Sequence, residues 1–303
     1  MANTITGLTV SVLRDAAIVK LSSVLAPLSA FTRDFGAEPL APGRSVIVPL
    51  TSADPTKYLK DGDTPTPTGT VDFEQTNTTM SPVTIAVNQI TMPFGITQKN
   101  LNDGIRLQQL AEANANAFAE AVMDQVTKLI TGANFTKPPI TVAAAGWGTN
   151  GAGIKAVYKS IAAARSKFAI LDPTLYAETM FTTAMSFVLG GSGGQAGVPT
   201  GAAAYGFTGI YPQNRWTGAT ANTAGFGCDP QAIAVASGPP VSPPEVDGAP
   251  FLRQESFTVP QIGLTCTLYM WLSTKTRSLW ASYDVMFGAA VGDPTAGVLI
   301  IPT

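Results

Sequence analysis

The sequence has 303 residues, enough for one large domain or two joined domains with an extensive core. Charged residues make up only 13 % of the chain and apolar residues 45 %, so an isolated monomer would carry little surface charge, and other copies of the chain are expected to cover part of its surface. Because the net charge is −2, the basic residues are scattered and histidine is absent, the composition argues against sequence-specific nucleic-acid binding and excludes histidine-based catalysis.

Residues 1–43 are expected to form an N-terminal arm. A short amphipathic pattern runs from Asp15 to Leu25, and Pro27, Pro39 and Pro42 then interrupt any longer helix. The arm is predicted to lie against an adjacent copy of the chain. The first residues show no basic region followed by an apolar block, so no secretory signal is expected.

Residues 44–92 are predicted to form an extended loop between two strands. Turn-forming residues gather at 61–69, while Val83, Ile85 and Val87 alternate with polar residues in the manner of a strand. An isolated two-stranded ribbon is only marginally stable in water, so this excursion is expected to rest on another molecule. The side chains expected to contact a neighbouring subunit are Lys57, Tyr58, Lys60, Asp61, Asp63, Val71 and Phe73.

Residues 93–150 contain the clearest predicted helix, over 103–132. Asp103 stands at the expected N-cap and Gly132 at the expected C-terminal stop. Apolar residues fall on one side of this helix, and a polar stripe at intervals of four residues runs along another side. The apolar side is represented by Leu110, Phe118 and Val122.

Residues 151–270 are predicted to hold a second helix and several core strands, and residues 271–303 to add C-terminal strands. The alternation in 264–272 is typical of a strand buried on at least one face. The second helix is expected over 154–168, strands over 174–180, 210–211, 231–236 and 264–272, a short helix over 182–189, loops over 190–206 and 237–250, and a last strand over 298–301 that joins the sheet of 264–272.

This order of elements resembles the HK97-like major capsid proteins of tailed bacteriophages, a fold shared with herpesviruses and encapsulins. The resemblance covers essentially the whole chain and is closest to the podovirus coat branch without its inserted domain. It rests on short phrases that occur in the same order, namely 1–8, 43–49, 93–97, 226–236 and 283–288 with 294–300.

The resemblance implies an α+β fold of the HK97-like type with an N-terminal arm (1–43), an extended hairpin called the E-loop (44–92), a peripheral domain with a spine helix (93–150), an axial domain (151–270) and C-terminal strands that return to the peripheral domain (271–303). It further implies assembly as pentamers and hexamers into an icosahedral head that encloses double-stranded DNA without reading its sequence. The expected location is the virion, assembled in the cytoplasm of a bacterial host.

The partners implied by the resemblance are copies of the same chain, a portal protein and, in some phages, a decoration protein. Relatives with a built-in scaffold begin with a charged helical segment, whereas this chain begins directly at the arm, so a separate scaffolding protein or none is expected. Some phages of this fold cross-link subunits through lysine and asparagine. Lys57 and Lys60 lie on the loop, but the sequence shows no matching asparagine and carboxylate pattern, and no cross-link is predicted.

No catalytic, cofactor or metal site is predicted, and the chain is not expected to be an enzyme. Cys228 and Cys266 are interpreted as small buried core residues with free thiols, with a disulfide as the alternative. Asp61 and Asp63 supply too few carboxylates for a calcium site, and the glycines of 190–194 lack the residues of a phosphate-binding loop. The four tryptophans, Trp147, Trp216, Trp271 and Trp280, are expected to anchor the core or an interface.

Two alternative functions stay open at the level of sequence. An encapsulin-type compartment would use the same fold to enclose a cargo enzyme. A secreted β-rich adhesin or glycosidase would be a monomer, and the 20 acidic residues offer carboxylate pairs without selecting one. A membrane protein is not expected, because no apolar stretch approaches the roughly 20 residues that a spanning helix needs.

Overall fold

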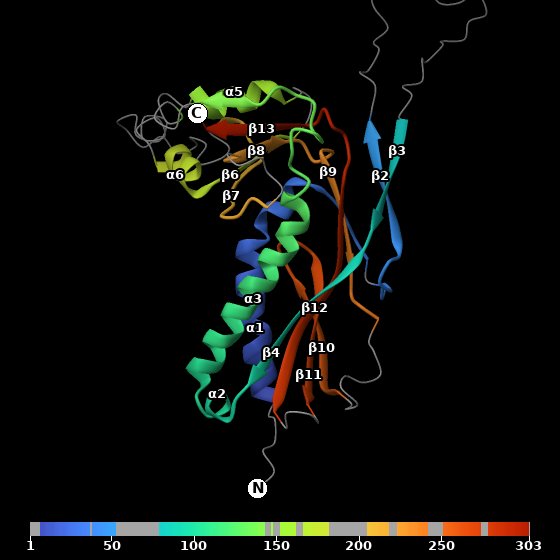
Figure 1. The fold of residues 1–303 in the computed structure, drawn as a ribbon, viewed down its shortest axis with the longest axis vertical. Coiled ribbons are helices and arrows are strands. Elements are labelled where there is room, and N and C mark those ends of the chain that lie inside the picture. Colours follow the sequence, from blue (N-terminus) through green and yellow to red (C-terminus); the bar gives the residue numbers. More distant parts are fainter. Residues whose placement is uncertain are drawn as a thin grey trace, which may run out of the picture.

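The structure is a computed structural model. It describes residues 7–36, 38–52, 79–142, 147, 152–161, 166–181, 205–217, 223–241, 251–273 and 278–302. Within these ranges no helix is both long and apolar enough to cross a bilayer. The elements lie along an elongated body, with the helices α1 (Gly7–Val24) and α3 (Gly104–Thr127) side by side at one end and β13 (Gly297–Pro302) at the other (Figure 1).

The larger sheet has six strands and one long central member, β12 (Leu279–Val291). The sheet order is β1-β9-β12-β11-β10, and β4 pairs with the first part of β12 on the side opposite β11. The strands are β1 (Thr32–Phe35), β4 (Asn88–Ile96), β9 (Ile233–Gly238), β10 (Phe251–Val259) and β11 (Leu264–Leu272). Odd-numbered residues of β12 face the two helices, so Tyr283 and Val285 belong to the main core. The strand predicted over 264–272 is confirmed.

Helix α1 corrects the expectation of an arm at 1–43. Its residues Val10, Leu13, Ala17 and Leu21 recur every three or four positions and are buried in the chain's own core, where the helix packs on α3. A short 3₁₀ helix (Ala26–Ala30) follows and buries Leu28. The sequence pattern underestimated the helix because its first turns contain glycine, threonine and serine, which favour helix weakly in isolation, whereas tertiary packing supplies the stability.

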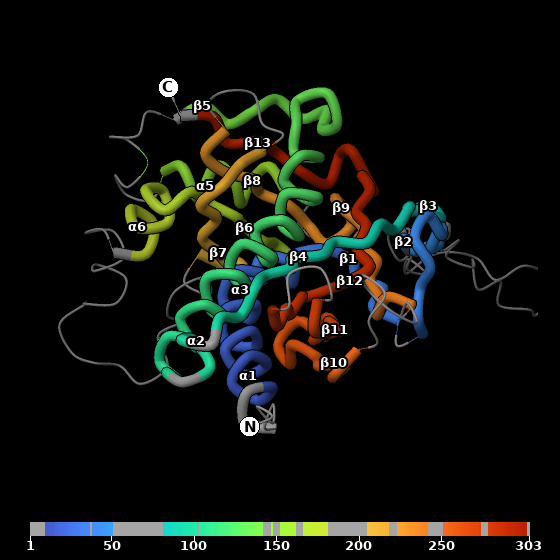
Figure 2. The backbone as a smooth tube through the Cα atoms, turned by 60° about the horizontal axis from the view of Figure 1, so that its bottom comes forward, coloured from blue at the N-terminus to red at the C-terminus, as the bar shows by residue number. Residues whose placement is uncertain are grey.

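The smaller sheet lies at the other end of the body and has the order β5-β13-β8-β6-β7. Helices α5 (Ala152–Ser160) and α6 (Pro173–Phe181) accompany it (Figures 1 and 2). Its core is a second apolar cluster around Trp147, Val157 and Leu171. The remaining strands are β5 (Ile140–Val142), β6 (Phe168–Leu171), β7 (Gly209–Pro212) and β8 (Gly225–Cys228).

Three predicted elements of this region are wrong. The segment 174–180 is not a strand but helix α6, because Asp172 caps it, its Oδ1 accepting from Leu175 N at 2.6 Å, and proline opens the first turn. The helix expected over 154–168 ends at Ser160, and Phe168 begins β6. The last strand pairs with β8 and β5 in the smaller sheet rather than with β11. An Asx-type turn, in which Thr295 N donates to Asp293 Oδ1 at 2.8 Å, redirects the chain between the sheets.

Candidate assembly surfaces

A two-stranded ribbon stands at the side of the body and forms the base of the predicted loop (Figures 1 and 2). Its strands, β2 (Ser45–Ser52) and β3 (Thr79–Ala86), pair antiparallel, with Ser52 opposite Thr79. The inner face buries Val48, Leu50 and Ile85 against β9 and β12. The alternation of Val83, Ile85 and Val87 therefore predicted the strand and its buried face correctly.

The outer face of the ribbon is open. Ile47 lies on it with 62 % of its surface exposed, opposite Thr84. Pro49 and Pro82 are also directly opposite each other on this face. Proline has no N–H, and such a pair fits the non-hydrogen-bonded register, in which the backbone nitrogens point away from the partner strand. Both outer edges therefore lack a donor at this level, so strand addition is disfavoured and the outer side chains are the surface available for contact.

Close backbone contact holds the ribbon on the larger sheet. A side chain at Gly288 of β12 would place its Cβ atom 2.4 Å from Ala86 O, a distance that no real contact reaches. Glycine at 288 therefore lets β3 lie directly on β12. Sequence reasoning missed this role, since nothing in the local pattern identifies the partner strand.

All seven loop residues predicted to contact a neighbour lie outside the described residues. These are Lys57, Tyr58, Lys60, Asp61, Asp63, Val71 and Phe73. Their role in assembly stays a prediction, as does the interpretation of Asp61 and Asp63 as a turn. The loop predicted over 190–206 falls outside the described residues as far as residue 204, and the helix predicted over 182–189 does so entirely.

Helix α3 provides the long strut that the sequence predicts, although it ends at Thr127 rather than at residue 132. Asp103 is the N-cap, its Oδ1 accepting from Ile105 N at 3.1 Å and Arg106 N at 3.3 Å. With 24 residues the helix is about 36 Å long. Phe118 and Val122 are fully buried in the main core and Leu110 is half-buried against it, so the predicted apolar side is confirmed.

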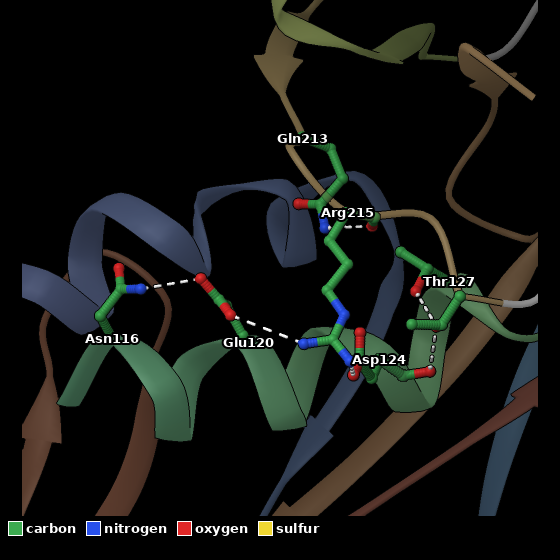
Figure 3. Close-up of polar contacts among 7 residues, drawn as sticks. Asn116, Glu120, Asp124, Thr127, Gln213 and Arg215 are labelled. Carbon is green, nitrogen blue, oxygen red and sulfur yellow. Dashed lines mark hydrogen bonds and ion pairs between the residues drawn. The ribbon is translucent and has the colours of Figure 1, made fainter. Parts of the chain in front are cut away.

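Ion pairs connect the polar side of α3 to the segment that follows β7. Strand β7 belongs to the smaller sheet. Figure 3 shows Arg215 reaching two carboxylates one turn apart, with its Nη1 3.7 Å from Glu120 Oε2 and its Nη2 3.1 Å from Asp124 Oδ2. Thr127 and Thr217 share a hydroxyl hydrogen bond of 2.8 Å beside it. The contact therefore joins the two ends of the body. The polar stripe was predicted, but its partner Arg215 was not, because the two are almost a hundred residues apart.

Large apolar side chains are exposed at several other places on the body. Ile105 at the start of α3 is 72 % exposed. Leu252 and Leu272 are exposed at the same end of the β10–β11 pair, where Phe251 pairs with Trp271. Val19 on α1 and Val241 after β9 are exposed as well. In a chain with few charged residues, such side chains are candidates for burial between copies.

Both cysteines lie within the described residues, and burial makes their thiols poor nucleophiles. Cys228 and Cys266 are free and buried, which confirms the expected buried thiols and excludes a disulfide between them. Burial raises the thiol pKa of both residues, with Asp229 and Asp284 adding smaller contributions of the same sign.

Of the tryptophans, Trp147 and Trp271 are buried as expected of core anchors, and Trp216 and Trp280 are half-buried. Within the described ranges no group of three or more acidic, cysteine or histidine side chains is placed to hold a metal ion.

Comparison with solved structures identifies proteins of similar fold. The virus-like particle from Pyrococcus furiosus is similar over 95 % of this chain and 97 % of that chain, with a TM-score of 0.51 and 11 % identity. A structure of Gordonia phage Cozz has a TM-score of 0.47 and 14 % identity, covering 93 % of this chain and 87 % of that one. The capsid structure of cyanophage P-SCSP1u has a TM-score of 0.45 and 12 % identity, covering 90 % and 86 %. No protein-family model and no curated protein matches the sequence.

Of these three structures, the virus-like particle alone exceeds a TM-score of 0.5. At 11 % identity this likeness shows the fold and nothing finer. The predicted α+β fold is thereby confirmed, and the chain shares it with the virus-like particle over nearly its whole length.

Proposed function

We propose that the chain is the major capsid protein of a tailed bacteriophage and assembles as pentamers and hexamers into an icosahedral head. The observation that carries the proposal is the fold shared with a virus-like particle over 95 % of the chain. Because fold alone does not fix function, the surface has to support the same conclusion.

The surface features support a protein that works through contacts with its own copies. The ribbon offers an open outer face around Ile47 whose edges resist strand addition, and the body exposes Ile105, Leu252 and Leu272. Burial of these side chains between copies would remove apolar surface from water. In an assembly with closed symmetry, each of these surfaces would contact a neighbouring copy. We expect each subunit to bury roughly several thousand Å² of surface in its contacts with other copies, as subunits of obligate assemblies do.

A deletion in the extended loop tests the proposed contacts. Ser52 and Thr79 are paired, so residues 53–78 can be replaced by Asn-Gly, which closes a two-residue hairpin between β2 and β3. The ribbon keeps its buried face, and we expect a folded protein that no longer forms closed particles. Circular dichroism measures folding, and sedimentation velocity measures assembly.

A control variant keeps the loop at full length and replaces the seven predicted contact residues with serine. If these side chains make the contacts, this variant assembles as poorly as the deletion. Normal closed particles from both variants would refute the role of the loop.

A second candidate function is a compartment shell that encloses protein cargo instead of a genome. The observation in its favour is that the structure with the highest TM-score of the three is described as a virus-like particle, not as a phage head. The ratio of absorbance at 260 and 280 nm of particles purified from the native source separates the two. Particles rich in nucleic acid support the capsid, and particles that contain a second protein without nucleic acid support the compartment.

The remaining parts of the proposal rest on sequence. We propose double-stranded DNA, a portal and a separate scaffolding protein as partners, and assembly in the bacterial cytoplasm. We further propose that the chain has no catalytic activity. That proposal is supported by the absence of histidine from the sequence and by the raised thiol pKa of the buried cysteines.

A further inference from the structure

Three lysines converge on an open pocket beside the C-terminal end of α5. The pocket has a volume of about 600 Å³ and lies between α5, the start of β6 and the turn before β13. Its lining residues are Lys137, Tyr158, Lys159, Ser160, Ile161, Lys167 and Thr295. In a chain of net charge −2 with scattered basic residues, this grouping of cations stands out.

Two of the lysines are held in place by the end of the helix. Lys137 Nζ donates to Ser160 O at 2.7 Å, and Lys167 Nζ donates to Tyr158 O at 2.8 Å. Carbonyl groups at the end of a helix have no partner within the helix, so they attract ammonium groups. Each ammonium uses one of its three donors in this way, so Lys137 keeps two donors for another ligand, and Lys167, which also contacts the Tyr158 ring, keeps at least one.

Lys167 is the most constrained of the three. Only 5 % of its surface is exposed, and its Nζ lies 3.5 Å from the centre of the Tyr158 ring. Within the described part of the chain, none of the three ammonium groups makes an ion pair. Asp293, the acidic residue in the adjoining turn, accepts hydrogen bonds from Thr295 N and Oγ1. A buried cation without a counter-charge is costly, and an anion in the pocket would offset that cost.

The charge balance of the pocket favours an anion. The end of a helix carries about −0.5 of an elementary charge, and Asp293 in the adjoining turn carries one negative charge. Together these are smaller than the three positive charges of the lysines. We propose that this pocket binds a phosphate group, held by Lys137, Lys159 and Lys167. Phosphate suits the site because lysine binds it as a compact charge without bidentate geometry. The source is either free orthophosphate or the backbone of a nucleic acid. The proposal does not depend on the proposed shell function.

Calorimetry on the full-length chain at low ionic strength tests the site with orthophosphate as the probe. We expect saturable binding of orthophosphate. Lys159→Gln should weaken the affinity by about fivefold, because the attraction between two unit charges 4 Å apart in water changes a binding constant by about that factor. Lys159→Arg should retain binding. Lys159 is exposed, so these variants should fold normally. Lys155→Gln is the matched control, because Lys155 is exposed on the same helix but does not line the pocket.

The absence of saturable binding, or an equal loss in Lys155→Gln and Lys159→Gln, would overturn the proposal. A competition arm with a short single-stranded oligothymidylate identifies the source. Displacement of orthophosphate by the oligonucleotide assigns the site to a nucleic-acid backbone, and saturable orthophosphate binding without competition assigns it to the free ion. Neither result depends on whether the chain forms particles, so failure of this proposal is distinguishable from failure of the shell function.

Discussion

Tyr283 connects four elements of the main core through one side chain. Its ring centre lies 5.4 Å from that of Phe94 on β4, 6.1 Å from that of Phe118 on α3 and 6.5 Å from that of Phe257 on β10. Its hydroxyl donates to Leu13 O on α1 at 3.0 Å. Tyr283 therefore links both helices to the sheet, α3 through its ring and α1 through its hydroxyl.

Substitutions at Tyr283 separate the ring from the hydroxyl. Tyr283→Phe should lower the free energy of unfolding by about 1 kcal/mol, the usual net contribution of one hydrogen bond. Tyr283→Ala should lower it by about 3–5 kcal/mol, because it opens a cavity among three aromatic rings. Urea denaturation of unassembled subunits measures both values, and equal losses in the two variants would contradict the role given to the ring.

The buried thiols make a prediction about alkaline pH. Burial raises the thiol pKa of Cys228 and Cys266, so the folded state holds its thiol protons at a pH where the unfolded chain has begun to lose them. The stabilisation is complete below the unfolded thiol pKa of about 8.5 and is lost as the pH rises above it. We expect the melting temperature to fall above that pH. A thiol reagent should label neither cysteine in the native protein and both in denaturant, and rapid native labelling would show the assignment to be wrong.

Individual elements could be predicted from the sequence where one local signal dominated. Asp103 indicated the start of α3, and the alternation in 264–272 indicated β11. Helix α6 was predicted as a strand although its cap Asp172 and its first residue Pro173 are local signals. The other failures occurred where the deciding partner is distant in sequence. Helix α1 is stabilised by packing on α3, the last strand by pairing with β8, and the polar side of α3 by Arg215. The loop predicted between β2 and β3 has a confirmed base, and its seven candidate contact residues remain predictions.

The seating of the ribbon on the larger sheet is testable through a single glycine. Gly288→Ala places a methyl group against Ala86 O, so β3 has to move away from β12. We expect a loss of about 1–3 kcal/mol, as overpacking typically costs. Gly95→Ala is the matched control in the same sheet, because its new Cβ would meet Trp280 at an ordinary 3.9 Å. Thermal denaturation compares the two, and comparable melting temperatures would argue against close backbone contact at 288.

At the scale of the whole molecule, the chain combines a firmly packed body with surfaces that lack a partner within one copy. The helices α1 and α3 bury one face of the larger sheet, β13 carries the chain into the smaller sheet, and the ribbon stands to one side (Figure 1). Within the described residues of one copy, the outer face of the ribbon is exposed. The apolar residues Ile105, Leu252 and Leu272 are exposed as well. Low charge, open ribbon and shared fold are explained together if many copies cover one another.

Electron microscopy of the purified full-length chain tests this conclusion most directly. The account predicts closed particles of uniform diameter, in which a reconstruction places the outer face of the ribbon against a neighbouring subunit. A monodisperse species of about the 31.4 kDa monomer mass, under all conditions of concentration and salt and with a scaffolding protein supplied, would contradict it.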